Sequence, residues 1–100
     1  MRLTHAQREQ IMRAIHERIG GDAEVWLYGS RADDGERGGD VDLLIRTGRA
    51  VAVLDQAALQ DRLERDLLLP VDVSFIDPAK GMTRFQRLVA AGALSLGATR

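Results

Sequence analysis

The apolar residues near the N-terminus follow the period of an α-helix. Isoleucine recurs every four residues, at Ile11, Ile15 and Ile19, so these side chains fall on one helical face. Thr4 and Gln7 match a capping box at the start of this segment, and two glycines follow its last isoleucine. The pattern predicts a helix of about four turns that begins after Thr4.

Similar spacing predicts two more helices, over about residues 50–66 and 82–91. In the first, leucine recurs every four residues with charged residues between, and Pro70 stops the helix. In the second, we expect one aromatic and two aliphatic residues to face inward. The residues that mark these two apolar faces are Leu59, Leu63 and Leu67, and then Phe85, Leu88 and Val89. Residues 88–96 are rich in Ala, Gly and Leu, which fits either packed core or part of a partner surface.

Three shorter segments have the composition and alternation of β-strands, namely residues 24–28, 40–46 and 71–76. Residues 30–34 could begin a short helix, and the three glycines that follow indicate a loop. The resulting order is α-β-(α)-β-α-β-α. Helices that alternate with strands in this way predict an α/β (α+β) fold with a small mixed central sheet and flanking helices.

Composition narrows the class of protein. We expect the 100 residues to form one domain, residues 1–100, and a hydrophobic fraction of 45% with 29% charged residues is typical of a folded globule. There are 14 basic and 15 acidic residues, so the chain has no excess of basic residues, and we expect no direct DNA binding. Cysteine is absent, which excludes disulfides and thiolate metal sites. No run reaches the ~18 apolar residues of a membrane span, and the N-terminus lacks the apolar core of a signal peptide, so we expect no membrane association and a cytoplasmic location.

Two carboxylates at the start of the second predicted strand are unusual for a segment that enters a core. Asp40 and Asp42 lie two residues apart, so their side chains project from the same face of the strand. Carboxylates this close repel one another unless a cation lies between them, and Mg²⁺ prefers such oxygen ligands. The alternative is a solvent-facing strand end, in which Asp40 caps a turn and Asp42 pairs with an arginine.

Two further features favour the metal site. Asp72 lies between two valines in another predicted strand, and three acids on adjacent strands suit a site for two ions ~3.5–4 Å apart. Gly29 and Ser30 directly follow a strand at a predicted helix start, where glycine, free backbone N–H groups and a hydroxyl can bind phosphate. Together these features indicate a metal-dependent site for a phosphorylated substrate.

The motifs Gly29-Ser30-Arg31-Ala32, Asp40-Val41-Asp42-Leu43 and Val71-Asp72-Val73 carry a resemblance to a known family. The chain resembles the minimal nucleotidyltransferase (MNT) domains of the DNA polymerase β-type superfamily, which are often encoded beside HEPN-domain proteins. The resemblance extends over nearly the whole chain through the order of the elements, and it implies the polymerase-β-type nucleotidyltransferase fold.

The resemblance also implies roles for individual residues. Gly29 and Ser30 are expected to bind the phosphates of a nucleoside triphosphate, with Arg31 as a further phosphate contact. Asp40, Asp42 and Asp72 are expected to be the catalytic residues and to bind Mg²⁺, two ions in all, with Asp72 also acting on the incoming hydroxyl.

Three hypotheses for the function follow. The first is an Mg²⁺-dependent transfer of a nucleoside monophosphate, AMP from ATP, to a hydroxyl. By the resemblance this hydroxyl belongs to a tyrosine of a cognate HEPN toxin, and the chain is then the antitoxin. The second is a binding module with little or no turnover that neutralises a partner protein by contact. The third is a structural α/β subunit.

Overall fold

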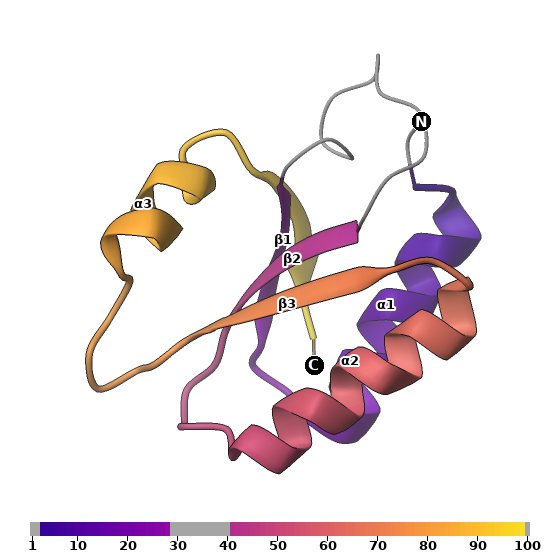
Figure 1. The fold of residues 1–100 in the computed structure, drawn as a ribbon, viewed down its shortest axis with the longest axis horizontal. Helices are drawn as coiled ribbons and strands as arrows, with labels where there is room; N and C mark the ends of the chain where they lie inside the picture. Colours follow the sequence, from indigo (N-terminus) through magenta and orange to yellow (C-terminus); the bar gives the residue numbers. More distant parts are fainter. Residues whose placement is uncertain (1–2, 29–40, 100) are drawn as a thin grey trace.

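The computed structural model describes residues 3–28 and 41–99. The described part contains three α-helices and four β-strands, arranged as shown in Figure 1. Their bounds are α1 His5–Arg18, β1 Glu24–Tyr28, β2 Val41–Arg46, α2 Val53–Leu67, β3 Val71–Ile76, α3 Arg84–Ala90 and β4 Leu94–Ala98. The predicted fold class, a small mixed sheet with flanking helices, is confirmed.

The four strands form one sheet in the order β3-β2-β1-β4. β1 runs antiparallel to both of its neighbours, β2 and β4, whereas β2 and β3 are parallel. The parallel pair requires a crossover connection, and helix α2 supplies it between the two strands. β2, which carries the second acid of the Asp-x-Asp pair, therefore lies in the interior of the sheet.

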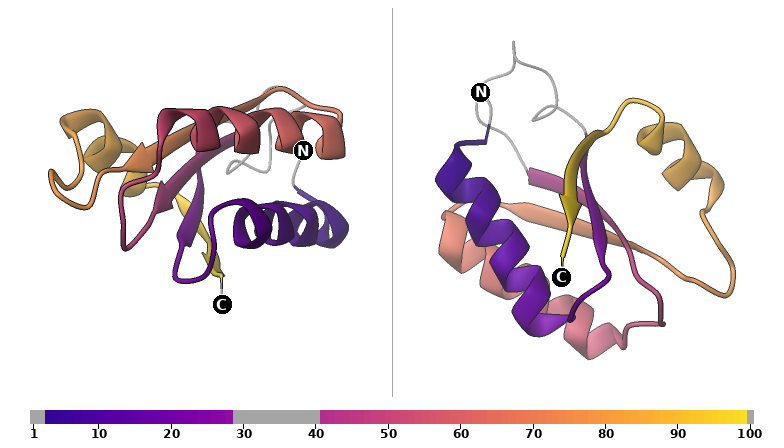
Figure 2. Two further views of the ribbon diagram at one scale, coloured as in Figure 1. Left: turned by 90° about the horizontal axis from the view of Figure 1, so that it is seen from below. Right: turned by 180° about the vertical axis from the view of Figure 1, so that it is seen from behind.

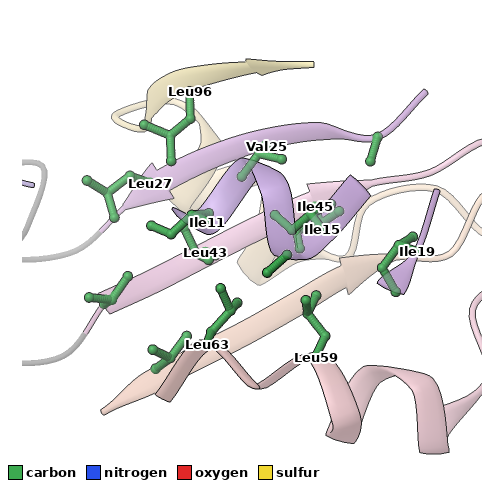
Figure 3. Close-up of a cluster of buried hydrophobic side chains, with 14 of the residues drawn as sticks. Ile11, Ile15, Ile19, Val25, Leu27, Leu43, Ile45, Leu59, Leu63 and Leu96 are labelled. Carbon is green, nitrogen blue, oxygen red and sulfur yellow. The ribbon is translucent and has the colours of Figure 1, made fainter. Parts of the chain in front are cut away.

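One face of the sheet builds the hydrophobic core against α1 and α2. Because strand side chains alternate, Val25 and Leu27 of β1 project to the same side as Leu43 and Ile45 of β2. They pack with residues of both helices, and all of these side chains are almost fully buried. Figure 3 shows the side chains from the two helices and the strands pointing toward one another. Figure 2 shows α1 and α2 side by side, with α3 apart from both.

The first predicted helix is confirmed together with its capping box. The Thr4 hydroxyl accepts a hydrogen bond from the backbone N–H of Gln7 at 3.0 Å, and the backbone N–H of Thr4 donates to the Gln7 side chain at 2.9 Å. The predicted face of α2 is confirmed as well, since its three leucines are buried. Within residues 3–28 and 41–99, no helix has both the length and the apolar character that a membrane span needs.

The predicted orientation of the last helix is wrong for two of its three residues. Phe85 is 57% exposed and Leu88 is 71% exposed, and Val89 is half-buried. The buried residue of α3 is Gln86, whose side chain donates hydrogen bonds to the Ser74 hydroxyl and to the backbone carbonyl of Phe75. The hydrogen bonds of Gln86 and a ring contact of Phe85 with Tyr28 join the helix to the sheet, and apolar spacing does not predict a buried glutamine.

A fourth strand, β4, was not predicted. It pairs with β1 at the edge of the sheet, and a shift in register between Val25 and Trp26 interrupts the pairing. Of residues 88–96, Leu96 is buried in the core, whereas Leu88 and Leu94 are exposed. Neither alternative for this segment therefore describes all of it. The irregular pairing breaks the alternation by which a strand is recognised in a sequence.

Candidate active site

Three polar side chains from three neighbouring strands form a row across one face of the sheet. In the parallel pairing of β2 and β3, Asp42 lies directly opposite Asp72. In the antiparallel pairing of β1 and β2, Asp42 lies opposite Tyr28. Residues paired in this way project from the same face. This face, which we call the acidic face, is the one turned away from α1 and α2, because Val41 and Leu43 on either side of Asp42 belong to the core.

The structure therefore brings together two of the three predicted acids. Asp42 is half-buried and Asp72 is exposed, so the pair is open to solutes. Paired carboxylates from adjacent strands are hard oxygen donors, and this donor chemistry fits Mg²⁺. Among the residues that the structure describes, no group of three or more potential metal ligands of the His, Cys, Asp or Glu type comes together.

The remaining predicted site residues lie outside the described residues. These are Asp40, Gly29, Ser30 and Arg31. In the chain, Gly29 follows the last residue of β1 and Asp40 precedes the first residue of β2. Their assignment to metal and phosphate binding stays a prediction.

Tyr28 is a member of the row that sequence analysis missed. Burial raises the pKa of its hydroxyl above the usual value, and the negative charges of Asp42 and Asp72 raise this pKa further. The hydroxyl therefore stays protonated at neutral pH and lies close enough to both carboxylates to sense their charge. The available signal was its place directly before Gly29, but its face could be assigned only once its pairing with Asp42 was known.

Helix α3 borders the acidic face. The ring of Phe85 meets the ring of Tyr28 in a T-shaped arrangement, with centroids 6.2 Å apart and an interplanar angle of 78°. Gln86 donates hydrogen bonds of 3.0 Å to the Ser74 hydroxyl and 2.9 Å to the Phe75 carbonyl. Ser74 lies two residues after Asp72, on the same face of β3. The helix that carries Phe85 is thus fixed to the strand that carries one of the acids.

Comparison with known families identifies the class of protein. The model of the nucleotidyltransferase domain family matches residues 8–91. The chain belongs to this family, and the matched segment contains all three predicted acids and the predicted phosphate-binding turn. No curated protein matches the sequence.

Solved structures with the same fold include MNT antitoxins. A complex of an MNT antitoxin with a tri-AMPylated HEPN toxin from Shewanella oneidensis matches with a TM-score of 0.77 and 16% identity, over 97% of this chain and 74% of that chain. A toxin–antitoxin structure with AMP-PNP matches with a TM-score of 0.77 and 18% identity, over 93% of this chain and 74% of that one. A structure described as a minimal nucleotidyltransferase matches with a TM-score of 0.68 and 28% identity, over 89% of this chain and 88% of that one. The predicted resemblance to minimal nucleotidyltransferases is confirmed.

Proposed function

We propose that this chain is an Mg²⁺-dependent nucleotidyltransferase that moves AMP from ATP onto a tyrosine hydroxyl of a HEPN-domain toxin, and that it acts as the antitoxin of that protein. The observation that carries the proposal is the in-register pair of Asp42 and Asp72 on an open face of the sheet. Family membership supports the reaction class. The similarity to an MNT antitoxin in complex with an AMPylated HEPN toxin supports a HEPN-domain acceptor protein and AMP as the transferred group.

The predicted site residues have separate roles in the proposed reaction. Asp40, Asp42 and Asp72 would hold Mg²⁺, which when bound neutralises phosphate charge and makes the attacking hydroxyl more acidic. Gly29 and Ser30, with Arg31, would bind the phosphates of the nucleotide and orient them.

Asp72 has a second role in the proposed transfer, as the base. It is exposed on the acidic face, so an incoming hydroxyl can reach its carboxylate, which accepts the proton. The hydroxyl oxygen forms a bond to the α-phosphorus as the bond from that phosphorus to the bridging oxygen breaks. Pyrophosphate leaves with the electron pair of the broken bond.

Transfer of labelled AMP tests this proposal. Purified chain, Mg²⁺, ATP labelled at the α-phosphate and a HEPN-domain toxin as acceptor are expected to yield labelled HEPN protein. Asp42→Asn removes one ligand charge while nearly preserving shape, so the variant is expected to fold and to lose the transfer. Asp55→Asn is the matched control, because Asp55 is exposed on α2, away from the acidic face, and this variant is expected to transfer at the wild-type rate.

The second candidate function, neutralisation by contact alone, is favoured by the exposed apolar residues Phe85 and Leu88 beside the site. The same experiment separates the two functions. If the wild type transfers no label and Asp42→Asn still neutralises the toxin fully, contact is the mechanism and the enzymatic proposal is wrong.

A further inference from the structure

The apolar stripe of α3 is largely exposed, although the Phe85 ring meets the Tyr28 ring at one side of it. Phe85 and Leu88 lie three residues apart, so they occupy neighbouring positions on one side of the helix, and both are more than half exposed. A helix on a sheet normally turns such a stripe toward the core. Here the buried position is taken by Gln86, which is 5% exposed and hydrogen-bonded to β3. The polar contact holds the helix in an orientation that leaves most of the surface of Phe85 and Leu88 exposed.

This stripe is continuous with the proposed active site. The Phe85 ring meets the Tyr28 ring in a T-shaped arrangement, and Tyr28 lies opposite Asp42 in the sheet. An acceptor hydroxyl that belongs to a protein must be brought to Asp42 and Asp72 together with the protein surface around it. The neighbouring surface of this chain is then covered by the same protein, and α3 is part of that neighbouring surface.

The charge around α3 differs from that of the rest of the chain. No Asp or Glu occurs after Asp77, so all 15 acidic residues lie before position 78. The described part of the C-terminal segment nevertheless carries three basic residues, Lys80, Arg84 and Arg87, all exposed. An otherwise acidic chain thus presents a local positive patch around an apolar stripe. Such a surface complements a partner that combines apolar side chains with carboxylates.

We propose that the outward side of α3, formed by Phe85 and Leu88 with Arg84 and Arg87, is the docking surface for the acceptor protein. The partner surface is apolar at its centre and acidic at its rim. This inference rests on the proposed function, because it is the transfer to a protein hydroxyl that requires a docked protein at this position. Aromatic and arginine residues at the centre of an interface commonly contribute most of its affinity.

Variants of exposed residues test the docking surface without disturbing the core. Leu88→Glu places a carboxylate in the stripe and opposes an acidic partner. Leu54→Glu is the matched control, because Leu54 is 83% exposed on α2, on the other side of the sheet. Both variants are expected to melt close to the wild type, and the thermal shift that Mg²⁺ with a non-hydrolysable ATP analogue produces is expected to be the same in all three proteins.

The readouts are binding of the HEPN-domain acceptor protein and transfer of label to it. We expect Leu88→Glu to raise both the Kd and the KM for that protein by at least about tenfold, with kcat at saturation unchanged. Leu54→Glu is expected to leave the Kd, the KM and kcat at their wild-type values. Arg84→Glu is expected to raise the Kd and to reduce its dependence on salt concentration.

Several outcomes would overturn the docking surface. One is a wild-type KM for Leu88→Glu, and another is a loss of affinity in Leu54→Glu as large as that in Leu88→Glu. The proposal is also wrong if the wild-type chain alone dimerises through this face, or if binding of the HEPN protein disappears after nuclease treatment. Failure of the proposed function looks different. In that case the wild type binds the HEPN protein without transferring label, and the Kd values of the three variants still decide whether α3 is where it docks.

Discussion

Gln86 is the anchor of α3, and its replacement by leucine tests how the helix is held on the sheet. The Gln86 side chain is 5% exposed. It donates hydrogen bonds to the Ser74 hydroxyl at 3.0 Å and to the Phe75 carbonyl at 2.9 Å, and it accepts one from the backbone N–H of Thr83 at 2.9 Å. Gln86→Leu keeps a side chain of similar size and removes all three hydrogen bonds.

The expected loss of stability follows from these three bonds. An intramolecular hydrogen bond contributes about 0.5–1.5 kcal/mol net, so their loss amounts to about 1.5–4.5 kcal/mol. Leucine regains part of this by burying an apolar side chain, whereas the Phe75 carbonyl loses a partner. We therefore expect the free energy of unfolding to fall by about 2–3 kcal/mol, which lowers Tm by roughly 10 °C for a domain of this size. The free energy of unfolding of a typical domain is about 5–15 kcal/mol, so we expect the variant to fold.

Urea unfolding followed by circular dichroism measures this loss, and hydrogen exchange of the α3 amides separates local detachment of the helix from global unfolding. The control is Gln60→Leu on α2, since the Gln60 side chain is half-buried and makes no hydrogen bond to another described residue. The control is expected to stay within about 0.5 kcal/mol of the wild type. If Gln86→Leu also stays within this range and its α3 amides keep wild-type protection, the polar anchor does not hold the helix.

Two more predictions concern the acidic face. Mg²⁺ with a non-hydrolysable ATP analogue at a hundredfold excess over Kd should stabilise the chain by ~2.7 kcal/mol and raise Tm by about 10 °C or more. Ser30→Ala should reduce the part that depends on the nucleotide and leave the response to Mg²⁺ alone nearly intact; a wild-type midpoint that does not move would contradict the site. In the metal-free protein, burial and the charges of Asp42 and Asp72 raise the pKa of Tyr28 above its usual 10.0, so the folded state binds the phenolic proton more tightly than the unfolded chain. This stabilisation is complete below pH 10.0, is lost as the pH rises through the folded pKa, and should be absent in Tyr28→Phe. Tyr28 is the only tyrosine in the chain, so tyrosinate absorbance reports its titration directly, and a midpoint at or below the usual value would refute the expected environment.

The sequence alone determined the features that depend on neighbours a few residues apart. Helix α1 begins where Thr4 and Gln7 predict it, because the two hydrogen bonds of the capping box join residues three apart. The apolar face of α2 follows from the helical period in the same way. The alternation of a strand likewise sufficed to separate Asp42, on one face of β2, from Val41 and Leu43 on the other.

Only the tertiary structure decided which strands meet and in what register. The pairing of Asp42 with Asp72 depends on the parallel alignment of β2 and β3, which joins residues 30 positions apart and is made through the crossover helix α2. Tyr28 joined the row through its pairing with Asp42. Strand β4 pairs with β1, which lies about 70 positions earlier in the chain. Because the register of this pairing is irregular, the sequence of β4 lacks the regular alternation that predicts a strand.

Helix α3 shows why a local pattern can also mislead. Its apolar residues have the spacing of a buried face, yet the side of the helix that packs on the sheet is the side of Gln86, which forms hydrogen bonds there. That choice depends on Ser74 and Phe75, which offer a hydroxyl and a carbonyl at the place where the helix lies. A buried polar group must find such partners, and whether they exist is settled by contacts between distant segments, not by the period of the helix itself.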